Sequence, residues 1–223
     1  MPSDLTAKQQ RDQRRAEKVA LLKRQQERAR RRRLAWIWGG SVAVVLVVAL
    51  VVTLVVTNGG GKSNPVAGSS QIKGLKTFPN LPANHVDPTP VNYQKLYGMN
   101  PPAGGNHWAE WLNCGVYDQP QQNERAVHDL EHGAIWITYD PKKVTEAQVT
   151  AMVAKLPNTY LTVSPYPGLP APVVASAWGN QVKLTGTTDA RLKQFVSAFW
   201  RSPNAPEPTS PCTGGFDGPG RVS

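Results

Sequence analysis

Residues 133–139 read Gly133-Ala134-Ile135-Trp136-Ile137-Thr138-Tyr139, a β-branched and aromatic run that is typical of a core strand. The apolar spacing that follows predicts two amphipathic helices, one over 145–156 and one over 188–200. Shorter β-rich runs predict further strands at 160–163, 173–178 and 181–184, with Gly179-Asn180 as the turn between the last two. Two helices packed on a small, mostly antiparallel sheet make an α+β domain.

The four histidines of the chain all lie between residue 85 and the start of this strand. Two of them belong to the segment 128–133, which reads His-Asp-Leu-Glu-His-Gly. A helix is expected here, because helix-forming residues start at Glu124 and Gly133 suits a C-terminal cap. On that helix His128 and His132 stand at i and i+4, so they share a face and can bind one metal ion.

We expect His128 and His132 to be paired metal ligands, with His107 as the third and His85 as a possible fourth. Such an all-histidine site suits zinc or copper, and without an open coordination position it is a binding site. Glu131 would then stand outside the ligand set and orient an imidazole.

Two other interpretations of the histidines stay open. The spacing matches the H-x-x-E-H signature of inverzincin peptidases, which makes the domain a small zinc hydrolase with Glu131 as general base. Those peptidases are larger and take an acidic ligand from a downstream helix, where this chain offers only Glu146 and Asp189 near helix starts. Alternatively the histidines brace loops, Glu131 pairs with Arg125 or another base, and the domain is a structural or interaction module of the cell envelope.

The two cysteines, Cys114 and Cys212, are expected to form a disulfide if the domain lies in an oxidising compartment. Closing a loop of roughly 100 residues stabilises a fold by about 4–5 kcal/mol in the chain-entropy model. The alternative makes Cys114 a thiolate metal ligand, which requires the disulfide to be absent.

The formal charge of +10 comes mostly from a basic arm at residues 1–33. This asymmetry excludes a uniformly basic domain that coats nucleic acid. Residues 34–57 carry no charged side chain, and at about 1.5 Å per residue they reach across a ~30 Å hydrocarbon core. We therefore predict a transmembrane helix there, with a cleaved signal peptide as the rival that fits the length less well.

Orientation follows from the arginines at 30–33, which abut this span. The positive-inside rule places the N-terminus in the cytoplasm and the C-terminal domain outside it, in a single-pass protein of the cell membrane. The arm is expected to lie near anionic lipid headgroups. Nucleic acid is an unlikely partner because no aromatic residue interleaves the charges, whereas an envelope protein partner stays open.

The chain is thus predicted to have five parts. They are the basic arm (1–33), the transmembrane helix (34–57), a Gly/Ser linker (58–71), the extracytoplasmic α+β domain (72–201) and an irregular Pro/Gly-rich tail (202–223). Residues 78–120, at the start of the domain, are rich in Pro, Gly and Asn and predict loops over short extended pieces.

Several separated motifs resemble a bacterial family called domain of unknown function 3105, over about residues 72–212. They are His85-Val86 with Tyr93, the segment 101–108, Gly115-Val116-Tyr117, the segment 127–139, Ala177-Trp178-Gly179, Phe195 and Pro206-Glu207. The resemblance implies a single-pass or signal-bearing exported protein and no established activity. It also implies that the four histidine positions and Glu131 belong to the shared pattern.

One departure from that family pattern concerns the segment 101–107. The family usually reads Pro-Pro-Thr-Ser-Gly-Pro-His, where this chain has Ala103, Gly104 and Asn106 in place of Thr, Ser and the second Pro. If that hydroxyl serves as nucleophile or ligand elsewhere in the family, the role is missing here. The departure weakens a Ser-His hydrolase and leaves the histidines untouched.

Overall fold

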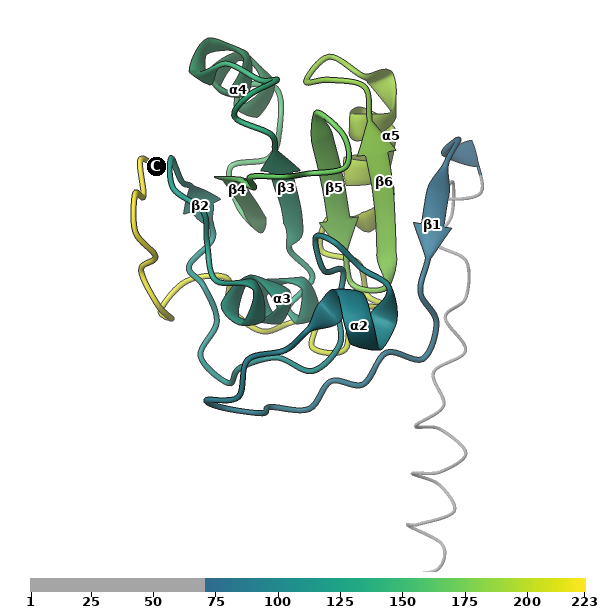
Figure 1. The fold of residues 1–223 in the computed structure, drawn as a ribbon, viewed down its shortest axis with the longest axis vertical. Coiled ribbons are helices and arrows are strands. Elements are labelled where there is room, and N and C mark those ends of the chain that lie inside the picture. The colour runs from purple at the N-terminus through teal and green to yellow at the C-terminus, as the bar shows by residue number, and fades with distance from the viewer. Residues whose placement is uncertain (1–70) are drawn as a thin grey trace, which may run out of the picture. The chain divides into compact units, whose positions relative to one another are not determined.

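The computed structural model describes residues 71–223, which form one mixed six-stranded sheet with four helices (Figure 1). The strand order is β1-β6-β5-β3-β4-β2. The strands are β1 (Leu75–Thr77), β2 (Gly115–Val116), β3 (Ile135–Tyr139), β4 (Leu161–Pro165), β5 (Val173–Ala177) and β6 (Asn180–Leu184). The helices are α2 (Tyr93–Tyr97), α3 (Asn123–Glu131), α4 (Glu146–Val153) and α5 (Ala190–Phe199).

The predicted core strand is confirmed as β3, which is buried along its whole length in the middle of the sheet. It pairs parallel with β4 through the crossover helix α4, and antiparallel with β5. β5 and β6 form a hairpin in which Ala177 faces Asn180, so the turn is Trp178-Gly179, one residue earlier than predicted. Gly179 supplies the positive φ of 67° that this turn needs. The sheet is mostly antiparallel, as expected. β1 forms one edge of the sheet, antiparallel to β6, and β2 forms the opposite edge, parallel to β4.

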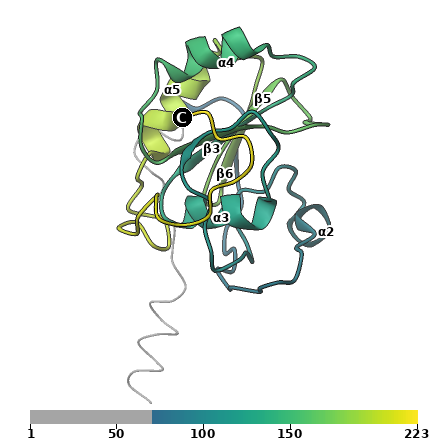
Figure 2. The same cartoon turned by 90° about the vertical axis from the view of Figure 1, so that its left-hand side faces the viewer.

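Side chains of β3 alternate between two apolar layers. Ile135, Ile137 and Tyr139 pack with α4 and α5, whereas Trp136 packs with Leu130 of α3 on the opposite face. Figure 2 shows α5 and α2 on opposite sides of the strands. The sheet thus separates the main core from α3, the helix that carries His128 and Glu131 and ends at the C-cap residue His132.

The helices at 145–156 and 188–200 are confirmed as α4 and α5. Thr145 caps α4 with a capping box to Gln148, and Asp189 caps α5. The helix expected near 124–132 is α3. The five-residue α2 was not predicted, because its capping residue Asn92 lies in a stretch whose Pro and Asn content favours loops.

Asp189 both caps α5 and forms an ion pair with Arg191 at 2.6 Å. Hydrogen bonds from Arg191 and from Thr185 hold the pKa of this carboxyl well below its ordinary range. Asp189→Ala is expected to lower the free energy of unfolding by about 1–2 kcal/mol at pH 7, measured by urea titration. Because the folded-state pKa lies below the unfolded value of about 3.9, the difference from wild type shrinks as the pH falls through that range. Asp189→Asn serves as the control, because asparagine can still cap the helix. The prediction is contradicted if the difference in free energy of unfolding between Asp189→Ala and wild type does not change with pH.

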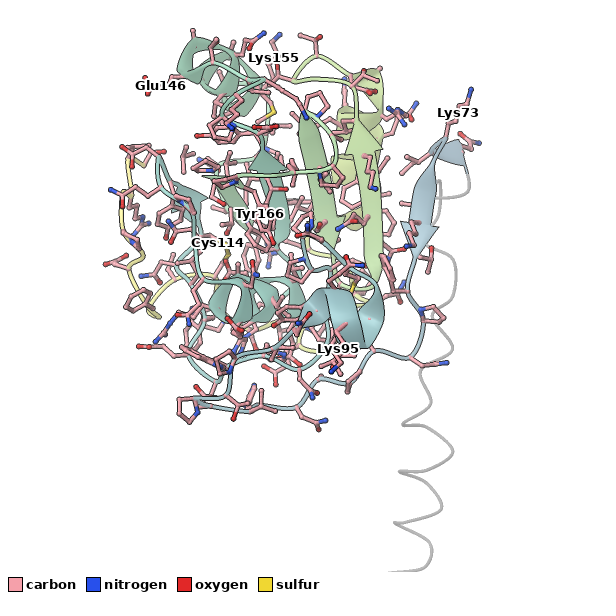
Figure 3. All side chains as sticks on the ribbon, in the orientation of Figure 1. Lys73, Lys95, Cys114, Glu146, Lys155 and Tyr166 are labelled. Carbon is pink, nitrogen blue, oxygen red and sulfur yellow. A yellow bond between two sulfur atoms is a disulfide. The ribbon has the colours of Figure 1, made fainter. Side chains whose placement is uncertain are left out.

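The tail at 202–223 contains no helix or strand, as predicted, but it is bonded to the domain. Phe216 exchanges backbone hydrogen bonds with Trp111 and Asn113, each 2.8 Å long. The predicted disulfide Cys114–Cys212 is present, with Cys114 inside the domain while charged side chains such as Lys95 lie at its periphery (Figure 3). This bond removes Cys114 from the candidate metal ligands.

Within residues 71–223, no helix is both long and apolar enough to span a membrane. The predicted arm at 1–33, the span at 34–57 and nearly all of the linker at 58–71 lie outside the described residues, so these remain predictions.

Candidate metal centre

Histidine and glutamate side chains gather in two adjoining groups at the C-terminal half of α3. Within each group the donor atoms lie within 4.8 Å of one another. The first group, here called the inner group, is His85, His107, His128 and Glu131. The second, here called the outer group, is His128, His132 and Glu207. The inner group can hold a metal ion, and it contains three of the four histidines singled out in the sequence.

The inner group combines one helix with two loop segments. His128 and Glu131 stand one turn apart on α3 and share its face. His85 and His107 are aligned by backbone hydrogen bonds, from Val86 N–H to the His107 carbonyl at 2.8 Å and from His107 N–H to the Asn84 carbonyl at 3.1 Å. These two bonds bring residues 85 and 107 together on the same side of α3.

Backbone carbonyls fix the imidazole tautomers of the buried histidines. Nδ1 of His107 donates to the Gly105 carbonyl at 2.8 Å, and Nδ1 of His128 donates to the Trp108 carbonyl at 2.6 Å. Because a carbonyl oxygen only accepts, the proton of each neutral ring lies on Nδ1 and the lone pair lies on Nε2. Metal-ligating histidines are oriented in this way, with one ring nitrogen bonded and the other free.

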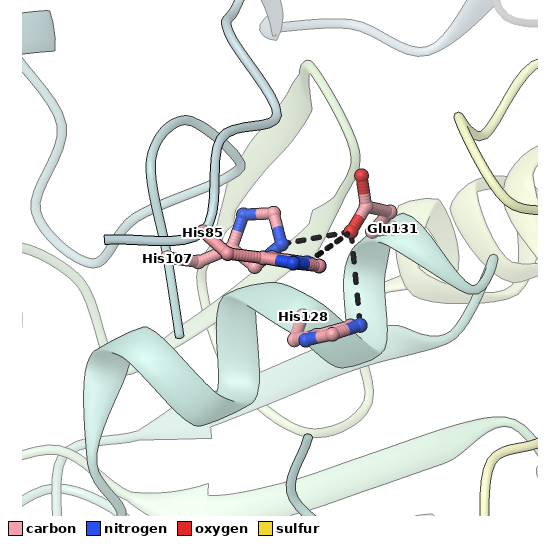
Figure 4. A group of neighbouring side chains, drawn as sticks. All are labelled: His85, His107, His128 and Glu131. Carbon is pink, nitrogen blue, oxygen red and sulfur yellow. Dashed lines mark hydrogen bonds and ion pairs between the residues drawn. The ribbon is translucent and has the colours of Figure 1, made fainter. Parts of the chain in front are cut away.

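The free nitrogens converge on one carboxylate oxygen. Nε2 of His107 lies 2.7 Å from Oε2 of Glu131, and Nε2 of His85 and of His128 each lie 3.7 Å from the same atom. Figure 4 shows the three rings around that oxygen. An ionised carboxylate is also an acceptor, so lone pairs face lone pairs unless a cation, a proton or a metal ion, lies between them.

Burial and the neighbouring imidazoles together set the charge states in this group. Burial lowers the pKa of His128 to about 4, even though the bond to the Trp108 carbonyl acts in the opposite direction. Burial alone would raise the pKa of Glu131, but the 2.7 Å contact with His107 and the neighbouring imidazoles lower it below its ordinary value. At neutral pH the group therefore presents a neutral His128 imidazole and an ionised Glu131 carboxylate, which are the protonation states that metal binding requires.

Access to the inner group is one-sided. The side chain of His107 is fully buried and those of His128 and Glu131 are nearly so, whereas the His85 side chain is 45% exposed. An ion can therefore reach the group past His85 while protein surrounds it elsewhere.

His132 is not a member of the inner group, so His107, His128 and His132 do not gather in one group as predicted, although His128 and His132 share the outer group. Its Nδ1 donates to the Pro211 carbonyl at 2.7 Å, and its Nε2 lies 3.6 Å from Oε2 of Glu207. The two rings are edge to face, with centroids 4.5 Å apart. The i, i+4 spacing places the two rings side by side, but His132 contacts the Pro211 carbonyl and Glu207 of the tail, whereas His128 lies near Glu131.

Glu131 is a member of the inner group. The sequence had predicted either that Glu131 lies outside the ligand set and orients an imidazole, or that it acts as a general base. Its pairing with Arg125, expected if the histidines only brace loops, is absent from the ion pairs of residues 71–223, in which Arg125 binds Glu110. One part of the loop-bracing interpretation is confirmed, because the Nδ1 atoms of His107, His128 and His132 bond to backbone carbonyls. That interpretation does not explain why the Nε2 atoms of these rings face carboxylate oxygens.

Sequence reasoning missed Glu207 of the outer group, and it did not single out Asp129, which is buried on α3 outside both groups. Glu207 enters from the tail, and only its place in the Pro-Glu motif pointed to it. Asp129 is fully buried on α3, where burial raises its pKa well above the ordinary range despite a 2.8 Å hydrogen bond from Thr162. Thr162 also contacts Cys114 Sγ, so Asp129 belongs to the disulfide side of α3.

Comparison with known proteins gives one match. A family model described as "Protein of unknown function (DUF3105)" matches residues 85–214, which include every member of both groups. No curated protein and no solved structure matches the chain.

Proposed function

The chain belongs to the family DUF3105, and we propose that its domain is a metal-binding module that holds one zinc ion between the four residues of the inner group. Copper is the second candidate ion. The module binds the ion and does not by itself imply a reaction.

The observation that carries this proposal is the convergence of acceptor atoms. The Nδ1 protons of His107 and His128 are committed to carbonyls, and their Nε2 atoms face Oε2 of Glu131 in a buried setting. Buried acceptors that face one another are unfavourable without a bridging cation. A proton can bridge the 2.7 Å contact of His107, but it cannot also satisfy His128 at 3.7 Å, whereas one metal ion satisfies all of them.

The donor set indicates which metal. Imidazole nitrogens suit zinc and copper, whereas calcium and magnesium prefer sets of oxygen ligands. Ligands about 2.0–2.1 Å from a tetrahedral zinc ion lie roughly 3.3 Å from one another. The distances of 2.7 and 3.7 Å from Glu131 Oε2 to the three Nε2 atoms bracket this value, and every pair of donor atoms in the group lies within 4.8 Å. Four ligands around zinc therefore require the wider-spaced donor atoms to move closer together.

A hydrolase fits this arrangement less well. In that mechanism the Glu131 carboxylate takes a proton from a metal-bound water, so Oε2 must face that water. Oε2 of Glu131 instead lies at hydrogen-bond distance from His107. We therefore favour Glu131 as a ligand.

Zinc content of the full-length protein, purified in detergent, tests the proposal. We expect about one zinc per chain by elemental analysis after dialysis, and loss of that zinc to a strong chelator with a fall in thermal stability. Glu110→Gln, which removes an exposed carboxylate outside both groups, serves as the control and is expected to keep the ion. Zinc-free and copper-free protein that takes up neither ion on titration would refute the proposal.

We also propose that this domain lies outside the cytoplasm, anchored by residues 34–57, with the basic arm close to anionic lipid headgroups. The uncharged segment beside a basic cluster supports this placement, and so does the disulfide, because disulfides persist in oxidising compartments. Extraction of membranes at alkaline pH is expected to leave the full-length protein in the pellet. A variant that lacks residues 34–57 should appear in the supernatant, and equal partition of both proteins would contradict the anchor.

A further inference from the structure

We propose that the outer group is a second, alternative position for the same ion, so that His128 is shared between two metal positions. This inference rests on the proposed function for the identity of the ion. It concerns His132 and Glu207, which the inner group does not use.

The outer group has the same construction as the inner one. The Pro211 carbonyl takes the Nδ1 proton of His132, which leaves the Nε2 lone pair facing Glu207 at 3.6 Å. The side chain of His132 is almost fully buried, and only about half of the Glu207 side chain is exposed. The Nε2 atom of a neutral ring and a carboxylate oxygen again face each other as acceptors.

Glu207 is held in place by the backbone and by its own segment. Its N–H donates to the Glu131 carbonyl at 2.9 Å, and its Oε2 accepts a hydrogen bond from Ser210 at 3.0 Å. The Trp111 ring packs beside His128 and His132, with centroids 5.8 and 5.2 Å away. The carboxylate is thus fixed next to two oriented imidazoles and is not a free surface side chain.

The two positions must exclude each other at His128. Its Nε2 has one lone pair, so it binds one ion at a time. The inner group offers four ligands and is mostly buried, whereas the outer group offers three and its Glu207 side chain is 49% exposed. The outer position therefore leaves a coordination site to water and binds more weakly, and the ion occupies it when the inner position is disabled.

Zinc titration of full-length variants by calorimetry tests this second position. The double variant His85→Ala, Glu131→Gln removes two ligands that belong to the inner group and not to the outer group. His85 is about half exposed and glutamine has the same shape as glutamate, so both changes are expected to leave the fold intact. We expect this double variant to bind one zinc with an affinity at least about 100-fold below wild type. Adding Glu207→Gln is expected to weaken the remaining binding by a further 10-fold or more. Glu207→Gln alone should change the wild-type affinity by less than about 3-fold, because the inner position is intact.

Controls separate this inference from the proposed function. Glu110→Gln in the double variant is the matched control and should leave the residual binding unchanged, and circular dichroism confirms that each variant is folded. A folded double variant that binds no zinc, or whose residual binding ignores Glu207→Gln, overturns the second position while zinc in the wild type still supports the first. Wild-type protein without zinc binding overturns both.

Discussion

His128→Asn is expected to lower the zinc affinity of the full-length protein by about 100-fold or more, whereas His132→Asn leaves it within about 3-fold. An asparagine amide can still donate to the Trp108 carbonyl in place of Nδ1, so the loop contact survives and only the Nε2 ligand is lost. If four ligands share a binding free energy of ~10–16 kcal/mol, one ligand contributes roughly 3 kcal/mol, which is on the order of 100-fold.

The paired substitutions decide between two arrangements of the same histidines. His132→Asn likewise keeps the contact to the Pro211 carbonyl and removes only Nε2. Competition with a chromophoric chelator measures both affinities under identical conditions. Equal losses in the two variants would mean that one ion is held by the i, i+4 pair, as the helical spacing alone predicts, and that the inner group is wrong.

The sequence located this site more successfully than it assigned the ligands. Helical periodicity shows that His128 shares a face with both Glu131 and His132, since i+3 and i+4 are both neighbours on a helix. The contact that distinguishes His132 from Glu131 comes from outside the helix, because the Nδ1 of His132 donates to the carbonyl of Pro211, 79 residues further along the chain. No local pattern contains that contact, so the all-histidine ligand set was a fair expectation from the sequence, and the place of Glu131 among three imidazoles was not foreseen.

The fold shows the same division between local and distant information. β3 and the β5–β6 hairpin were predictable because β-branched runs and a Gly turn determine them locally. β1 and β2 are three and two residues long, and they exist because a neighbouring strand offers hydrogen bonds to them. Their sequences contain no comparable periodicity. The cysteine pair was predictable for a different reason, since a chain with two cysteines has only one possible pairing.

Replacing both cysteines by serine is expected to lower the free energy of unfolding by about 4–5 kcal/mol, the second large effect. The bond closes a sequence separation of 98 residues, and in the chain-entropy model the stabilisation grows with the length of the closed loop. Thermal melts of the two proteins should differ by roughly 10 °C or more at this chain length. Wild type under a strong reductant serves as the comparison and should approach the variant, because both lose the same constraint.

Hydrogen exchange of the Cys114→Ser, Cys212→Ser protein separates loss of this constraint from general damage. The Asn113 N–H donates to the Phe216 carbonyl and the Phe216 N–H donates to the Trp111 carbonyl, so both amides depend on contact between the tail and the domain. These two amides should exchange faster than global unfolding of the variant explains, because the tail opens locally once the disulfide is gone. The amide of Ile137 on the central strand should follow global unfolding in both proteins. Uniform acceleration of all amides would show that the disulfide stabilises the domain without tethering the tail. The outer metal position would then not depend on it, because His132 and Glu207 meet only where the tail stays against α3.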